Sequence, residues 1–79
     1  MQKISLTGYV AKAQFGQGSK SEHDALKISS GPQEFFLRMP NQNPFEIVVQ
    51  NEALIGKRVH VEGFVEGTTL FANHLQVCG

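Results

Sequence analysis

The chain of 79 residues contains one cysteine, one tyrosine, three prolines and no tryptophan. Because Cys78 is the only cysteine, no disulfide can form within the chain. A hydrophobic core contributes little net free energy of folding in a domain of this size, and small domains often add disulfides or a metal. The sequence therefore favours one domain, residues 1–79, stabilised by a closed barrel or by a second copy of itself.

Neither sign of charge is in excess, since seven Lys and Arg residues balance seven Asp and Glu residues. Proteins that coat DNA without selectivity carry a basic surplus, so the balance argues against such a coat while allowing a local basic patch. No apolar run approaches the length of a membrane helix, and no secretion signal is evident. We expect a cytoplasmic protein with no membrane partner, and a single cysteine suits a reducing compartment.

Apolar and polar residues alternate in five segments, which is typical of half-buried β-strands. The alternation is predicted to change phase at Gly8 and at Gly63, and at Gly8 this indicates a bulge or a sharp coil. Gly31-Pro32 predicts the turn of a hairpin between the second and third segments. The odd apolar spacing near Asn73-His74 predicts another bulge. The segments are residues 3–14, 25–30, 33–39, 57–66 and 68–77.

A short helix is predicted between the third and fourth segments. Asn43 is a suitable N-cap, Pro44 fits the first helical position, and Glu46 completes a capping box. Gly56 provides a left-handed stop. The β-branched run at residues 47–49 is a contrary signal, because such residues favour strands.

The most informative part of the sequence is near its end, in residues 56–63 (GKRVHVEG), Gly67 and residues 69–72 (TLFA). These residues resemble the fourth and fifth strands of OB-fold domains that bind nucleic acid. The order of elements also resembles the OB-fold over nearly the whole chain. The resemblance implies an all-β, five-stranded Greek-key barrel with a short helix between strands 3 and 4. In that family, ligands lie across strands 2 and 3, between the loops joining strands 1 to 2 and 4 to 5.

The alternation also predicts which side chains fill the barrel. They are the apolar residues that share the inner face of each strand, together with one aromatic from the predicted helix. The expected core is Ile4, Leu6, Val10, Leu26, Ile28, Phe35, Leu37, Phe45, Val59, Val61, Leu70 and Leu75.

The outer face of the second and third strands is the candidate binding surface. Alternation places Lys27, Phe36 and Arg38 there together with Glu34. A nucleic-acid base can stack on Phe36 while Lys27 and Arg38 meet phosphates. The alternative is that Phe36 covers a core edge or a second subunit, while Arg38 pairs with Glu34. Phe64 and Phe15 are further aromatic candidates, whose facing the irregular backbone leaves open.

The glycine-rich loop at residues 16–21 contributes Lys20. It is not a phosphate-binding P-loop, because Ser19 stands where that pattern needs a glycine directly before the lysine. Backbone N–H groups together with Lys20 are a weaker candidate for holding one phosphate. The alternative is a solvated loop.

The sequence gives little support for a catalytic site or for a metal site. Ser21, His23 and Asp24 are crowded into one loop, which rarely allows the geometry of a catalytic triad. His60 and His74 are predicted neighbours across the last two strands, but no ligand spacing typical of a metal site accompanies them. We expect neither catalysis nor a cofactor.

Two functions remain as expectations. The first is a non-catalytic module that binds single-stranded nucleic acid or a nucleotide through Lys20, Lys27, Phe36, Arg38 and Phe64. The second is a protein-interaction module, either an accessory subunit of a larger complex or a homodimer, with Phe36 and Phe64 as interface anchors.

Overall fold

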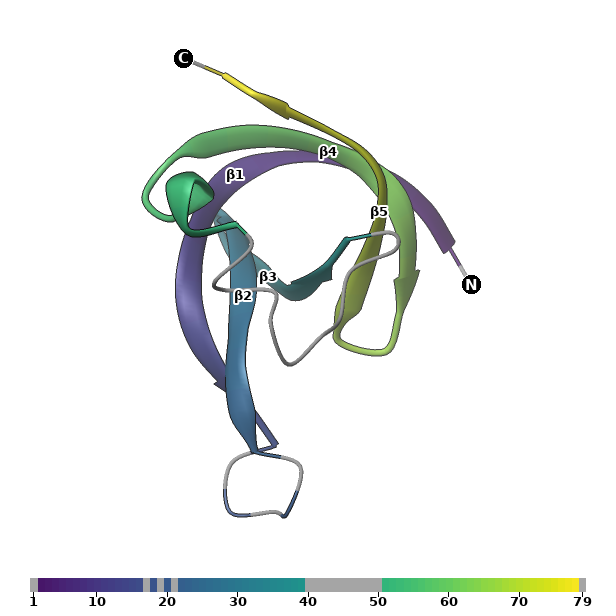
Figure 1. Ribbon diagram of the computed structural model, residues 1–79. Coiled ribbons are helices and arrows are strands. Elements are labelled where there is room, and N and C mark those ends of the chain that lie inside the picture. Colours follow the sequence, from purple (N-terminus) through teal and green to yellow (C-terminus); the bar gives the residue numbers. More distant parts are fainter. Residues whose placement is uncertain (1, 17, 19, 21, 40–50, 79) are drawn as a thin grey trace.

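The computed structural model describes residues 2–16, 18, 20, 22–39 and 51–78, which form an all-β fold (Figure 1). Each strand coincides within two residues with a segment of alternating hydrophobicity. The elements are β1 (Gln2–Phe15), β2 (His23–Ser30), β3 (Gln33–Arg38), the short 3-10 helix η1 (Glu52–Leu54), β4 (Arg58–Glu66) and β5 (Thr69–Val77).

The five strands close into a barrel in the order β1-β2-β3-β5-β4, and β4 pairs back with β1. Among the strand pairs of the described residues, only β3–β5 is parallel. The long strand β1 makes closure possible, because residues 2–9 pair with β4 and residues 9–15 pair with β2. Tyr9 belongs to both ladders. The predicted five-stranded Greek-key barrel of the OB type is confirmed.

Gly8 and Gly63 are inward positions where strands approach closely. Both are buried and continue the alternation of their strands, so the predicted change of phase at each was wrong. A Cβ atom at Gly8 would collide with the carbonyl oxygen of Ser29, and one at Gly63 with that of Phe71. Glycine is needed at both positions because a larger residue would not fit between the two backbones. Such close approach of strands is expected in a small, strongly coiled barrel.

The irregularity near Gly63 lies in the partner strand. The β4–β5 register shifts between Glu62, which faces His74, and Gly63, which faces Ala72. Asn73 is therefore the extra residue of a β-bulge, as the spacing near Asn73-His74 predicted. The bulge lets Ala72 and Leu75 both point toward the core despite their odd separation.

The barrel interior is filled mainly by the side chains that alternation predicted. Ile4, Phe35 and Leu75 are partly buried against this core, and Phe45 lies outside the described residues. Ala25 and Ala72 are buried as well. The core members at most 1% exposed are Val10, Leu26, Ile28, Leu37, Val59, Val61 and Leu70.

The segment before β4 differs from the predicted helix in its described part. Its 3-10 turn, η1, contains only Glu52–Leu54, while the capping residues expected from Asn43 onward lie outside the described residues. Gly56 does adopt the left-handed conformation, with φ 85°. Its N–H donates to the Val10 carbonyl at 2.7 Å, which ties this turn to β1. Within the described chain, no helix is long and apolar enough to cross a membrane.

Candidate functional site

The outer face of β2 and β3 carries an aromatic ring beside a cation. Lys27 and Phe36 face each other in the β2–β3 register, and their neighbours Leu26 and Leu37 point into the core. The Lys27 Nζ atom lies 5.7 Å from the centroid of the Phe36 ring. This distance is within the range of a cation–π interaction.

The Phe36 ring belongs to a cluster at the projecting end of the β1–β2 hairpin. The Phe15 ring meets it edge-on, with centroids 5.1 Å apart and an interplanar angle of 85°. The centroid of the His23 imidazole lies 5.3 Å from that of the Phe15 ring. Phe36 is half-buried and Phe15 is 39% exposed, so planar ring surface remains in contact with solvent.

A second aromatic–cation pair lies next to the first, on β3 and β5. Arg38 and Phe71 are paired in the parallel register, and the Arg38 Cζ atom lies 5.6 Å from the Phe71 ring centroid. Phe71 faces Phe64 across the β4–β5 ladder, and Lys3 of β1 faces Phe64 from the other side. Phe64 thus points outward, which resolves the facing that the sequence left open.

We call this surface the aromatic face. It is defined by four aromatic and two cationic side chains, contributed by β1, β2, β3, β4 and β5. Its members are Phe15, Phe36, Phe64, Phe71, Lys27 and Arg38.

The acidic residue of this surface pairs with Lys27. The Glu34 carboxylate lies 3.7 Å from Lys27 Nζ, and Ser29 Oγ donates a hydrogen bond to it at 3.3 Å. The alternative pairing of Arg38 with Glu34 is wrong, because Glu34 faces Ser29 at the far end of β3. Arg38 forms no ion pair with a carboxylate among the described residues.

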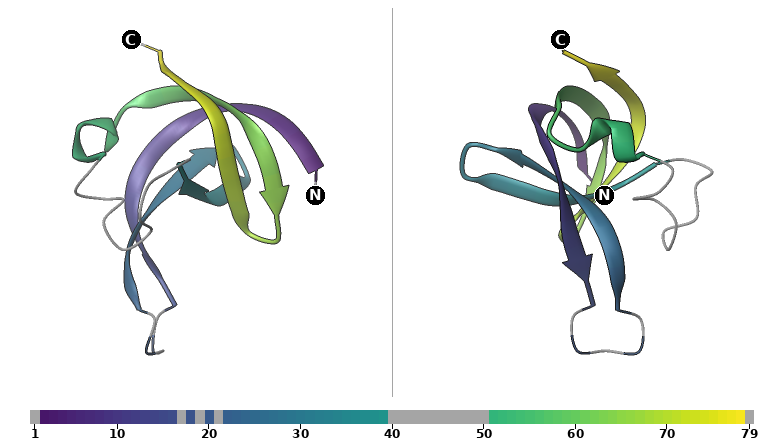
Figure 2. Two further views of the ribbon diagram at one scale, coloured as in Figure 1. Left: turned by 45° about the vertical axis from the view of Figure 1, so that its right-hand side comes forward. Right: turned by 60° about the vertical axis from the view of Figure 1, so that its left-hand side comes forward.

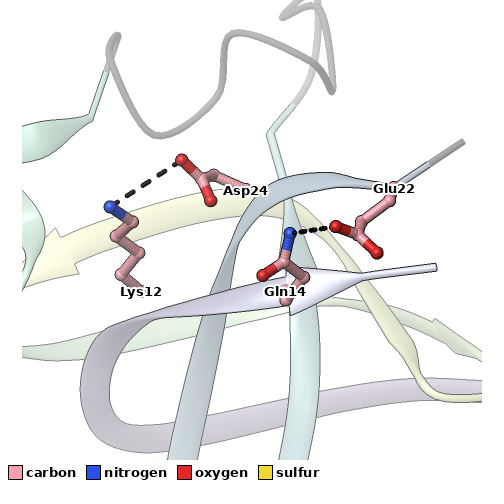
Figure 3. A network of polar contacts seen from close by, with 4 residues as sticks. All are labelled: Lys12, Gln14, Glu22 and Asp24. Carbon is pink, nitrogen blue, oxygen red and sulfur yellow. Dashed lines mark hydrogen bonds and ion pairs between the residues drawn. The ribbon is translucent and has the colours of Figure 1, made fainter. Parts of the chain in front are cut away.

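The β1–β2 hairpin projects beyond the barrel beside the aromatic face, and Figure 3 shows the polar contacts that hold its end together. Gln14 Nε2 donates to Glu22 Oε1 at 3.1 Å, and Lys12 approaches Asp24 at 3.7 Å. The Gly18 N–H donates to the other Glu22 oxygen at 2.7 Å. This N–H is therefore occupied by a carboxylate, which counts against the predicted backbone phosphate site in this loop.

Lys20 is the exposed cation of that loop, and it lies near the tip of the hairpin. Ser21, the nucleophile of the rejected triad, lies outside the described residues. His23 and Asp24 are consecutive in β2, and their contacts run to different residues, Phe15 and Lys12.

The β4–β5 connection is a tight turn on the same side of the barrel as the β1–β2 hairpin end (Figure 1). Glu66 and Thr69 still pair, which leaves only Gly67 and Thr68 in the turn. The Thr68 carbonyl accepts a hydrogen bond from the Phe36 N–H at 2.8 Å. The turn supports the backbone under Phe36 and is too short to wrap over a ligand.

The histidines do not assemble a metal site. His60 faces Gln76 rather than His74, and its two ring nitrogens lie 3.0 Å from Ser5 Oγ and 2.8 Å from Thr7 Oγ1. Among the described residues, no group of three or more His, Cys, Asp or Glu side chains is placed to hold a metal ion.

Sequence reasoning identified Phe36, Lys27, Arg38 and Phe64 but missed Phe71 as a member of the aromatic face. A signal for it was present, because Phe71 follows Leu70, which was assigned to the core, and successive residues of a strand point to opposite faces. Its position beside Arg38 depends on the parallel β3–β5 pairing. Such pairing is not visible in a local pattern.

Comparisons with known proteins assign no family to the chain. Neither the protein-family models nor the curated proteins that were searched gave a match.

Proposed function

We propose that the protein binds single-stranded nucleic acid across the aromatic face. The observation that carries the proposal is the side-by-side arrangement of two aromatic–cation pairs, Phe36 with Lys27 and Phe71 with Arg38. Each pair offers a ring for a base and a positive charge for the adjoining phosphate. Proteins that bind single strands without sequence preference combine these two features.

The rings support binding to unpaired bases rather than to duplex. Bases in a duplex are stacked on one another, whereas those of a single strand can spread out and stack on aromatic side chains. Each stack contributes about 1–3 kcal/mol to binding. Because any base has a face to stack, we expect little sequence preference.

The charge balance supports modest affinity with a measurable salt dependence. Lys27 already interacts with Glu34, and Glu66 ends β4 close to Phe64. These carboxylates weaken the positive field over the aromatic face. Binding then depends on stacking as well as on the release of counterions from phosphates.

The proposal is tested by titrating fluorescently labelled single-stranded DNA and RNA of mixed sequence at two salt concentrations. A duplex of the same sequence serves as the matched control. We expect the single strands to bind more tightly than the duplex, with affinity falling as salt rises. Absence of binding at low salt, where electrostatic contacts are strongest, would refute the proposal.

A protein partner is the second candidate, supported by large apolar side chains exposed outside the core. Tyr9 is 58% exposed, Val77 44% and Phe15 39%. Aromatic side chains are common anchors of protein interfaces. Sedimentation of the free protein over a range of concentrations tests for a homodimer, and a mass that stays at 8.7 kDa would rule it out.

A further inference from the structure

A third aromatic–cation pair lies around the barrel from the aromatic face. Tyr9 of β1 faces Arg58 of β4 in the antiparallel register. Both side chains point outward, because Gly8, Val10 and Val59 beside them are buried. The pair repeats the composition of Phe36 with Lys27, on a part of the barrel that the resemblance to OB domains did not indicate.

The pair borders an open hollow of about 410 Å³. Its lining also includes Gly56, Lys57 and Cys78. Figure 2 shows the surrounding elements, η1, the start of β4 and the end of β5, on the side of the barrel away from the β1–β2 hairpin end. A hollow with an aromatic wall has room for a planar group and a phosphate beside it.

The two charged residues that line this hollow are both cationic. Lys57 and Arg58 are exposed, and neither pairs with a carboxylate in the part of the chain that the structure describes. The neighbouring backbone N–H groups are already engaged, since Gly56 donates to Val10, Lys57 to Leu54 and Cys78 to Arg58. Recognition of an anion here therefore depends on the two side chains.

The hollow is continuous with the aromatic face. Tyr9 faces Ser29 on β2, so Lys27, two residues before Ser29, is its diagonal neighbour on the outer surface. Diagonal neighbours on paired strands are about 7–8 Å apart, within reach of long side chains. Across the sheet, the route from Phe71 to Tyr9 crosses three strand spacings, about 14 Å. It also runs about 13 Å along the strands, because Thr69, Phe36, Lys27 and Ala11 form one row and Phe71 and Tyr9 lie two residues to either side of it.

We infer that a bound single strand continues from the aromatic face past Lys27 to this hollow. One base stacks on Tyr9 there, and Lys57 and Arg58 hold the adjoining phosphate. This inference rests on the proposed function and extends its binding site around β1. The number of nucleotides bound then exceeds the number that the aromatic face alone can bind. It stays within the site size of about 4–16 nucleotides known for OB domains.

The composition of the chain provides a direct readout of Tyr9. It is the only tyrosine, and the protein has no tryptophan, so intrinsic tyrosine fluorescence reports on this position alone. The experiment titrates the protein with unlabelled oligothymidylates of about 4, 8 and 12 nucleotides. Emission is corrected for absorption by the DNA with free N-acetyltyrosinamide. A labelled 12-mer gives the affinity independently.

We expect the 4-mer to bind while leaving the tyrosine emission nearly unchanged, and the 12-mer to quench it by half or more. The variant Arg58→Ala combined with Lys57→Ala should weaken 12-mer binding about tenfold and leave 4-mer binding unaltered. Lys12→Ala is the matched control, because it also removes a cation but one that pairs with Asp24 on the hairpin. It should behave like the wild type with both lengths.

The outcomes separate the two proposals. If no oligonucleotide binds at any length, the proposed function itself fails. If the 12-mer binds but neither quenches Tyr9 nor responds to the double variant, only the extension around β1 is refuted. Equal quenching by the 4-mer would also overturn it, because the hollow would then bind independently of the aromatic face.

Discussion

The ammonium group of Lys27 has two neighbours, the uncharged aromatic ring of Phe36 and the negatively charged carboxylate of Glu34. Its ammonium group is 5.7 Å from the ring centroid and 3.7 Å from the carboxylate oxygen. The ion pair is partly exposed, with relative accessibilities of 33% for the Lys27 side chain and 55% for that of Glu34. Ion pairs of this kind contribute at most about 1 kcal/mol. A phosphate can therefore compete with Glu34 for the lysine.

This competition predicts that Glu34→Gln strengthens binding of single-stranded DNA. Removing the negative charge frees Lys27 and ends repulsion of the phosphates, so we expect a gain in affinity of about twofold to fivefold, equivalent to less than about 1 kcal/mol. Glu62→Gln, an equal change of charge on β4, is the control. An equal gain in both variants would indicate a general charge effect rather than release of Lys27.

A substitution of Phe36 can distinguish a role in stacking on bases from a role in packing within the barrel. Phe36→Leu keeps an apolar side chain against Phe15 but removes the planar ring, so the fold should survive while affinity falls about fivefold to a hundredfold. Circular dichroism and a fluorescence titration measure the two effects. Wild-type affinity in a folded Phe36→Leu variant would remove Phe36 from the site. Unfolding of this variant would instead assign Phe36 to the supporting structure of the barrel.

At the scale of elements, β1 and β5 show how the barrel closes. β1 pairs with β4 along its first half and with β2 along its second half, and β5 accommodates the bulge at Asn73. Gly8 lets β1 approach β2 closely at Ser29, and Gly63 lets β4 approach β5 closely at Phe71, because neither glycine has a side chain. The β4–β5 pairing places Phe64 and Phe71 side by side on the outer surface of the barrel.

We therefore predict that Gly63→Ala destabilises the protein by at least about 2 kcal/mol, because the added methyl group must displace backbone at Phe71. The control is Gly67→Asn in the β4–β5 turn. A Cβ atom there meets nothing within 4 Å, and asparagine tolerates the φ of 62°. Urea denaturation of both variants gives the comparison. Equal stability of Gly63→Ala and wild type would contradict the close approach of β4 to β5.

At the scale of the whole molecule, zero net charge hides an uneven distribution. Lys12 and Lys27 form ion pairs with Asp24 and Glu34, whereas Arg38, Lys57 and Arg58 form none with the carboxylates that the structure describes. Cations without a partner lose less when they meet a phosphate. The composition alone therefore underestimates the capacity of the barrel to bind an anionic polymer.

The salt dependence of binding counts these cations. For single strands, the slope of log K against log salt falls by about 0.7 for each phosphate neutralised. Arg38→Ala should make the slope shallower by about that amount. Lys20→Ala should do the same, if the loop cation touches the strand. The slope is measured from titrations at several salt concentrations, and an unchanged slope in either variant would mean that its cation touches no phosphate.

Much of the architecture was predictable because strand alternation is a local property. A period of two residues identifies the inner face of a strand without knowledge of its neighbours. Leu26, Ile28, Val59 and Val61 were assigned to the core in this way, and all four are fully buried. The bulge near Asn73 was likewise visible in the spacing of apolar residues.

The sequence by itself determined the five strands, most of the core, and the outward facing of Lys27, Phe36 and Arg38. Only the tertiary structure decided which side chains share the outer surface, because neighbours across strands depend on register and closure. The parallel β3–β5 pair places Arg38 over Phe71, and the β1–β4 pair brings Tyr9 opposite Arg58. Tyr9 and Arg58 are 49 residues apart in the chain (58 minus 9), so no local pattern relates them.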